Sequence, residues 1–280
     1  MVVNLIKLYS IIIIVLLWVA CNAAAYDNLL FRPLTANVFE PRIGCLYQWG
    51  SNTNDDEKLR LDIGASIDLA DFKFGQDSTQ IRFGTDWFTY TRLRTEGNMK
   101  FPVETSDYFF GINSSAKTKL CGLDLYGRLR LAHISSHIVD GLATGDSLRV
   151  MPFVYSREFA ELTAAVVYRG IRPYLGLTYV FSHQPKAVDE LILQAGVDYT
   201  NEIFCNLYFI SGIDFRLPGL NQVESAFSFQ AGLLLRTSDK VGVMINYSRF
   251  TGRSIHGMFY NSDDNYSAIG FQVVYYGFTF

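Results

Sequence analysis

Alternation of apolar and polar residues is the feature that most constrains the fold of this chain. Between Leu59 and Leu69 the odd positions are apolar, whereas the even positions are charged, small or polar. A period of two places these two sets on opposite faces of a β-strand. The pattern returns along the chain, and no amphipathic helix pattern exists to cover the apolar faces. A closed barrel in lipid would keep every apolar face away from water and would leave no strand edge without a hydrogen-bonding partner.

Composition favours the same architecture. The 280 residues are 49% hydrophobic and 15% aromatic, yet beyond residue 25 there is no apolar run of about 18 residues that could form a transmembrane helix. High apolar content without helical spans is typical of membrane barrels, because lipid-facing and lumen-facing residues alternate. The formal net charge of −3 gives no support for a nucleic-acid partner. A soluble β-sandwich remains the alternative fold.

The alternating segments predict an all-β fold: a single antiparallel up-and-down transmembrane β-barrel of about 12 strands. Long polar connections alternate with tight turns, which we expect at 170–171, 200–202 and 237–238, and the connection 70–79 is the misfit. The predicted strands span residues 42–50, 58–69, 79–94, 106–113, 119–137, 152–169, 172–182, 188–199, 203–216, 223–236, 239–250 and 267–280.

The N-terminus has the pattern of an export signal. Lys7 precedes an apolar core, and the three alanines 23–25 offer a small-residue cleavage site. Cys21 leaves open a lipoprotein signal instead. We therefore predict a cleaved signal peptide over 1–25, a periplasmic N-terminal segment over 26–41 and the barrel over 42–280. Whether the 26–41 segment plugs the barrel stays open.

The cysteines do not predict a disulfide framework. The part of the chain after the signal holds Cys45, Cys121 and Cys205, an odd number, each within a predicted strand.

The polar faces of the predicted strands carry both signs of charge. One interpretation is a selectivity lining for a polar solute. The favoured one is a salt-bridge network that fills a narrow, non-conducting lumen, because opposite charges share strands and would pair across them. The predicted network comprises Arg82, Asp86, Arg92, Arg94, Asp124, Arg128, Arg130, Arg157 and Glu161.

One group of side chains could carry chemistry. His133 and Ser135 continue the lipid-facing parity of the fifth strand near its outer end. Counting strand pairing from the short turn at Gly170 puts residue 133 opposite a position near 155, so Ser156 and Glu158 come within reach of His133. The alternative is that these residues have simply left the membrane and are hydrated at the rim.

The end of the chain resembles the closing strand of bacterial outer-membrane barrels. One face of the last predicted strand carries Tyr276, Phe278 and Phe280, and Phe280 is the final residue. The resemblance implies that these three residues are the signal by which the barrel-assembly machinery recognises the chain. It also implies a location in the bacterial outer membrane, among its lipids.

His133-Ile134-Ser135 resembles the His-x-Ser motif of the outer-membrane phospholipase A and lipid A deacylase barrels. The resemblance implies Ser135 as nucleophile, His133 as general base and Glu158 as the carboxylate that orients the histidine. The chain departs from those families because no Asn follows within a short hairpin and the connection 138–151 is long.

A broader resemblance covers most of the N-terminal half. Phe31-Arg32-Pro33-Leu34, Phe83-Gly84-Thr85-Asp86 and the stretch 152–159 are similar to a family of bacterial outer-membrane proteins of unknown function. This resemblance implies an outer-membrane location and a barrel architecture, and it implies no activity.

No cofactor or metal motif is recognisable. His133 and His137 would lie roughly 13 Å apart along a strand, which is too far for one metal ion. The acidic runs 55–57 and 263–264 could hold Ca²⁺ in external loops, although solvated acids are the alternative.

Three functions follow from these patterns. The first is a non-conducting component of the cell envelope that is either structural or binds protein partners. The second is an interfacial lipid hydrolase, and the third is a small-solute channel.

Overall fold

The structure, a computed structural model, describes residues 29–50, 57–74, 79–186, 190–218, 225–238 and 241–275. The predicted cleavage segment 1–25 and the proposed assembly signal at Tyr276, Phe278 and Phe280 lie outside these residues. No helix in the described parts of the chain is long and apolar enough to cross a membrane.

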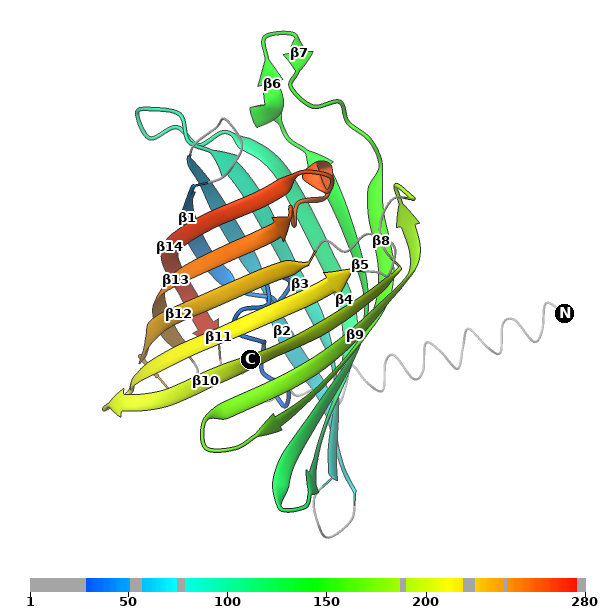
Figure 1. Cartoon of the computed structure of the whole chain (residues 1–280), viewed down its shortest axis with the longest axis vertical. Helices are drawn as coiled ribbons and strands as arrows, with labels where there is room; N and C mark the ends of the chain where they lie inside the picture. The colour runs from blue at the N-terminus through cyan, green and yellow to red at the C-terminus, as the bar shows by residue number, and fades with distance from the viewer. Residues whose placement is uncertain are drawn as a thin grey trace, which may run out of the picture.

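The described strands form a closed antiparallel barrel of twelve strands, which confirms the predicted fold class (Figure 1). Neighbours in the barrel follow the chain, and β1 pairs with β14 to close it. The barrel strands are β1 (Ile43–Trp49), β2 (Glu57–Phe74), β3 (Thr79–Arg94), β4 (Val103–Leu120), β5 (Leu123–Ile138), β8 (Tyr155–Val167), β9 (Ile171–Gln184), β10 (Leu191–Phe204), β11 (Leu207–Pro218), β12 (Ala226–Arg236), β13 (Val241–Arg253) and β14 (Asp263–Tyr275).

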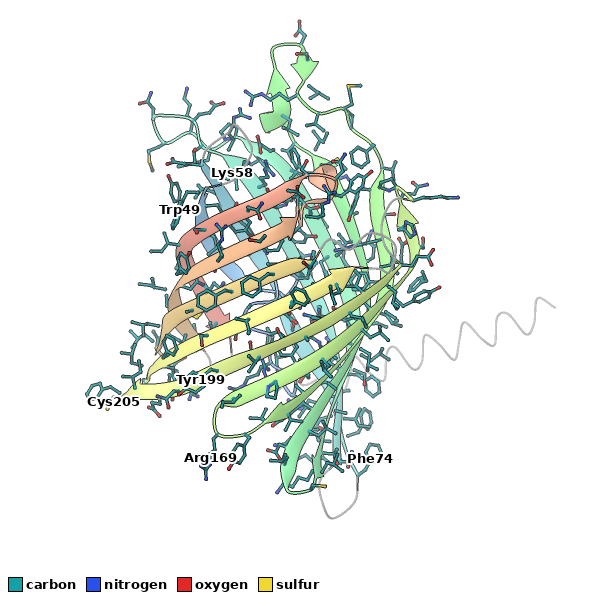
Figure 2. The ribbon with its side chains drawn as sticks, viewed as in Figure 1. Trp49, Lys58, Phe74, Arg169, Tyr199 and Cys205 are labelled. Atoms are coloured by element: carbon teal, nitrogen blue, oxygen red, sulfur yellow. The ribbon has the colours of Figure 1, made fainter. Side chains whose placement is uncertain are left out.

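The connections give the barrel a loop end and a turn end. Figure 2 places Trp49 and Lys58 near one end and Phe74, Arg169 and Cys205 near the other. At the loop end, the hairpin β6 (Ala143–Thr144) and β7 (Ser147–Leu148) projects beyond the barrel, as Figure 1 shows. Two short 3-10 helices, η1 (Asp140–Leu142) and η2 (Gly257–Phe259), lie in loops of the same end.

Several predicted boundaries are corrected at the turn end. Strands β2 and β3 pair as far as Phe74 and Thr79, so the expected connection at 70–79 is strand over most of its length. The turn expected at 200–202 lies instead after Phe204, because β10 and β11 pair that far.

Two of the three cysteines are turn residues, contrary to the prediction that all lie in strands. Cys121 and Cys205 occupy the turns β4–β5 and β10–β11 and are exposed, whereas Cys45 lies in β1. Cys121 has φ 51° and is followed by Gly122 with φ 79°. Two successive residues with positive φ form the two-residue turn that matches the twist of a hairpin.

The alternation seen in the sequence separates the outer surface of the barrel from its interior. On β2, Leu61 and Ile63 are 37% and 45% exposed, whereas Arg60 and Asp62 are each 1% exposed. Inside the barrel, Phe88, Tyr90 and Phe109 form an aromatic layer, with 4.9 Å between the ring centroids of Phe88 and Phe109.

The loop between β13 and β14 folds into the loop end of the barrel. Asp107 on β4 accepts hydrogen bonds from the Nδ1 of His256 and from the backbone N–H of Gly257, both at 2.8 Å. Ser136 on β5 accepts a hydrogen bond from the N–H of Met258 at 3.2 Å. Ile255, His256 and Met258 are buried, so this loop closes over the aromatic layer.

The segment before β1 lies inside the barrel. Leu30 and Thr35 donate their backbone N–H groups to Asp68 and Asp198 at 2.8 and 3.1 Å. Phe31 packs with Tyr174 of β9 in a small apolar cluster. The described part of the predicted 26–41 segment, from residue 29, therefore occupies the lumen, the point that the sequence left open.

Candidate functional site

The outer surface of β5 and β8 carries a paired histidine and glutamate. The two strands pair without interruption from Asp124 opposite Val167 to Ser136 opposite Tyr155, and this register places His133 directly opposite Glu158. Nδ1 of His133 lies 2.8 Å from Oε1 of Glu158. The side chains are 41% and 31% exposed, so the pair lies at the barrel surface. The predicted pairing, with residue 133 opposite a position near 155, was wrong by three residues. The turn at Gly170 joins β8 to β9, so it does not set the register between β5 and β8.

Ser135 follows on the same outward face. Ala132, Ile134 and Ser136 are buried, whereas His133 and Ser135 are half-buried, so the parity holds to the loop end of β5. Residues two apart on a strand are separated by roughly 6.6 Å along it. His133 and Ser135 are therefore adjacent positions on the outward face of β5.

Aromatic side chains border this site on the β4 side. Tyr108 and Phe110 are the cross-strand partners of Ser135 and His133. Their rings are nearly parallel, with centroids 6.5 Å apart, and Phe110 also stacks with Trp87 at 6.5 Å. His137 packs edge-on against Tyr108 at 5.6 Å. The sequence analysis missed these neighbours because only the register shows which residues of β4 adjoin the site.

The chemistry of this arrangement follows from the two nitrogens of the imidazole. With its Nδ1–H donated to the Glu158 carboxylate, His133 keeps Nε2 as an acceptor. An acceptor nitrogen beside a serine hydroxyl can remove the hydroxyl proton, and the carboxylate fixes the tautomer and stabilises the imidazolium that forms. The outer face thus carries a serine hydroxyl, an imidazole and a carboxylate close together.

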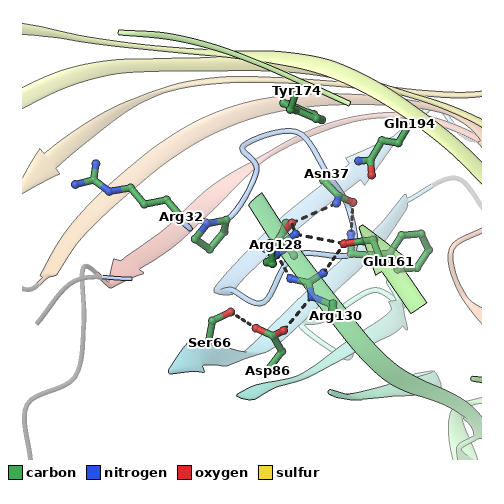
Figure 3. A network of polar contacts seen from close by, with 12 residues as sticks. Arg32, Asn37, Ser66, Asp86, Arg128, Arg130, Glu161, Tyr174 and Gln194 are labelled. Atoms are coloured by element: carbon green, nitrogen blue, oxygen red, sulfur yellow. Dashed lines mark hydrogen bonds and ion pairs between the residues drawn. The ribbon is translucent and has the colours of Figure 1, made fainter. Parts of the chain in front are cut away.

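A second polar group lies inside the barrel and is built around two arginines. Arg130 bonds to Asp86 at 2.9 Å, to Glu161 at 3.2 Å and to Glu40 at 3.0 Å. Arg128 bonds to Glu40 and, at 3.3 Å, to Glu161. Figure 3 shows Arg128 and Arg130 close to Glu161 and Asp86, with Ser66 bonded to Asp86. We call Glu40, Asp86, Arg128, Arg130 and Glu161 the lumen network.

The remaining residues of the predicted charge network are distributed differently. Arg82 bonds to Asp68 at 3.3 Å, and Arg92 and Arg94 both bond to Glu104. Two residues lie apart from these ion pairs. Arg157 packs over the rings of Phe39 and Phe159, at 4.8 and 5.8 Å from their centroids. Asp124 pairs with Lys117 at 3.1 Å near the turn end.

Glu40 is the one residue of the lumen network that the sequence analysis missed. It precedes β1, in a segment without any alternating pattern, and is 1% exposed. Burial raises the pKa of its carboxyl, but the charges and hydrogen bonds of Arg128 and Arg130 outweigh burial and lower the pKa to about 2. Glu40 is therefore ionised in the barrel, and it ties the N-terminal segment to β5.

The described residues contain no group of three or more His, Cys, Asp or Glu side chains that could hold a metal ion. Of the acids considered for Ca²⁺, Asp263 pairs with Arg253 at 3.4 Å and Asp264 with Arg92 at 3.9 Å. Asp55 and Asp56 lie outside the described residues.

A cavity of about 770 Å³ remains in the lumen at the turn end. The N-terminal segment forms one wall through Leu30 and Pro33, and the strands contribute Arg82, Arg172 and Gln230. Arg172 is already bonded to Asp198 and to the carbonyl of Arg32 at 2.9 Å, so part of this charge is used to hold the segment.

The fold and the sequence each have recognisable relatives. Over 89% of this chain and 94% of the other, the structure is similar to an active-site mutant of the outer-membrane phospholipase A from Escherichia coli, with a TM-score of 0.60 and 12% identity. It is equally similar, at a TM-score of 0.60 and 11% identity over 88% of this chain and 94% of the other, to the Salmonella typhi outer-membrane phospholipase dimer with bound calcium. At such low identity the likeness shows the fold of an outer-membrane β-barrel. None of the curated proteins matches the sequence. A family model described as "Protein of unknown function (DUF1207)" matches residues 16–278.

Proposed function

The chain belongs to the DUF1207 family of proteins of unknown function, and we propose that this member is an interfacial serine hydrolase of acyl-ester lipids in the bacterial outer membrane. The observation that carries the proposal is the 2.8 Å contact between Nδ1 of His133 and Oε1 of Glu158 beside Ser135, on the outer face of the barrel. The likeness of the whole fold to outer-membrane phospholipase A supports the proposal further.

The position of the site fits a substrate held in a membrane. Leu129 and Leu131 precede His133 on the same face and are 46% and 45% exposed, as lipid-facing residues would be. The ester groups of a lipid lie between its acyl chains and its head group, at the boundary of the apolar layer. A nucleophile near the loop end of β5 would meet such an ester without the lipid leaving the bilayer.

The reaction would proceed through an acyl-enzyme. Ser135 Oγ attacks the ester carbonyl carbon as its proton passes to His133 Nε2, and the carbonyl oxygen takes the electron pair of the broken π bond. The ester C–O bond then breaks, and the leaving alkoxide takes the proton from His133 to depart as the alcohol. Water repeats the sequence on the acyl-enzyme, which releases a fatty acid and restores Ser135. Glu158 accepts the Nδ1–H throughout and stabilises the imidazolium.

Fatty-acid release from phospholipid and lipopolysaccharide vesicles by the refolded full chain tests the proposal. We expect release by the wild type and its loss in Ser135→Ala and His133→Ala, with an alkyl fluorophosphonate attached to Ser135 in the wild type. Ser114→Ala is the matched control, because Ser114 is also half-buried on the outer face but lies opposite Leu129, away from the site. A wild type that neither releases fatty acid nor takes up the fluorophosphonate would refute the proposal.

A second candidate is a non-conducting component of the cell envelope that binds protein partners. The N-terminal segment, the lumen network and the folded loop before β14 together occupy much of the barrel interior, which favours this candidate over a small-solute channel. Recording from planar bilayers tests it: discrete conductance steps with the full chain would favour the channel instead.

A further inference from the structure

A pair of serines lies next to the His133–Glu158 pair. The register that sets His133 opposite Glu158 sets Ser135 opposite Ser156, one step of two residues toward the loop end. The pairing is unbroken between these two positions. In an antiparallel sheet, pairs two residues apart belong to the same type, so the geometry of one predicts that of the other.

The distance between the two serines follows from this arrangement. Directly opposed residues have Cβ atoms about 4.5–5.5 Å apart. The histidine–glutamate pair, with atoms 2.8 Å apart, confirms that side chains of this face approach each other. Ser156 is half-buried and lies on the β8 side of Ser135, whereas the β4 side is occupied by the ring of Tyr108.

We propose, on the basis of the hydrolase function above, that Ser156 is a catalytic residue whose hydroxyl donates a hydrogen bond to the oxyanion formed during attack by Ser135. The negative charge forms on the carbonyl oxygen, one bond from the carbon that Ser135 attacks. A hydroxyl on the opposed residue of the neighbouring strand is therefore close enough to donate a hydrogen bond to that oxygen. A donor in that position acts mainly in the transition state, because the oxygen is only weakly charged in the ground state. Ser156 thus supplies an element that neither His133 nor Glu158 can provide, since both are engaged with the proton of the nucleophile.

The test compares Ser156→Ala with Ser156→Thr in the vesicle assay, with the full chain refolded and folding checked by resistance to unfolding in detergent on a gel. Removal of one oxyanion donor lowers kcat by about 10²–10³-fold. We expect that loss in Ser156→Ala with KM little changed, and recovery of most of the rate in Ser156→Thr, which keeps a hydroxyl on a strand-compatible side chain. Ser114→Ala should leave kcat unchanged.

Three results would overturn the inference while the hydrolase stands. These are wild-type kcat in Ser156→Ala, failure of Ser156→Thr to restore the rate although it folds, and fluorophosphonate attached to Ser156 in the Ser135→Ala variant. The last result would make Ser156 the nucleophile. A wild type without hydrolysis and without label would overturn the proposed function, and the role of Ser156 with it.

Discussion

Substitution of Glu40 by alanine should release the N-terminal segment from the lumen. In the structure, Glu40 accepts two hydrogen bonds from Arg128, through Nη1 and Nη2, a third from Nη2 of Arg130 and a fourth from Nδ2 of Asn37 at 3.4 Å. Nη2 of Arg128 keeps Glu161 as a partner at 3.3 Å when Glu40 is removed. The other three donors lose the hydrogen bonds shown here, at about 1–3 kcal/mol for each buried donor left unsatisfied.

The charge balance limits the effect to the low end of that range. Without Glu40, the two arginines still face Asp86 and Glu161, so no net charge is stranded. We therefore expect the free energy that holds the segment in place to fall by about 3 kcal/mol, the low end of what breaking a buried ion pair costs. That corresponds to about a hundredfold larger population of the released segment.

Hydrogen exchange followed by mass spectrometry can measure this release in the refolded barrel. Exchange of peptides from residues 29–42 should accelerate about a hundredfold in Glu40→Ala, while the strands keep their protection. Glu96→Ala is the control, because Glu96 pairs with Arg94 but is half exposed in a loop. Unchanged exchange of the segment in Glu40→Ala would refute the reasoning and assign its docking to apolar contacts such as those of Phe31.

Four further outcomes are expected. The pKa of Glu40 is lowered from 4.5 to about 2, so the docked segment binds fewer protons than the released one. The stabilisation of docking by Glu40 should therefore be fully present above about pH 4.5 and be lost as the pH falls toward 2, which exchange normalised to unstructured peptides can follow. Glu158→Ala should lower kcat of the proposed hydrolase by about 10²–10⁴-fold by leaving the base unoriented, and a near-wild-type rate in the vesicle assay would contradict that role. Asp107→Ala should speed exchange in the loop around His256 because two buried donors lose their acceptor, at about 1–3 kcal/mol each; equal protection in both proteins would argue against it. Cys121 lies at the turn end, which we expect to face the periplasm because outer-membrane barrels have short periplasmic turns and long external loops. It should therefore react with a membrane-impermeant maleimide only after the outer membrane of cells is permeabilised, and labelling in intact cells would contradict this orientation.

The barrel could be predicted from the sequence wherever one face of a strand is uniformly apolar. In β3 the predicted strand 79–94 agrees with the structure, whereas in β2 the predicted strand 58–69 ends five residues early, close to the register shift between Asp68 and Ala70. The second half of β4 was missed because Ser114, Ala116 and Thr118 give its outer face little apolar character. The turns at Cys121 and Cys205 were missed for a related reason: both hairpins turn without the Asn-Gly or Asp-Gly pairs that mark such turns in a sequence.

The candidate site could be predicted in part. The alternation of side chains along a strand is enough to place His133 and Ser135 on one face. Their cross-strand partners depend on the register between β5 and β8, which cannot be inferred from the types of residue in the two strands. Glu158 was within the range considered, although the pairing was offset along β8. Glu40 gave no signal at all, because a single acid in an aperiodic segment is indistinguishable from a solvated one until its partners on β5 are known.

The docked segment has a consequence for how the chain can assemble. It precedes β1, yet it is held by Asp198, 163 residues later in the sequence than its partner Thr35. A closed barrel offers no lateral opening, because β1 and β14 pair along the whole of β1. The segment must therefore enter through an open end or be in place before the β1–β14 seam forms. In the second route the N-terminal segment fills the lumen before the sheet has closed. The segment then serves as the core around which β14 pairs with β1.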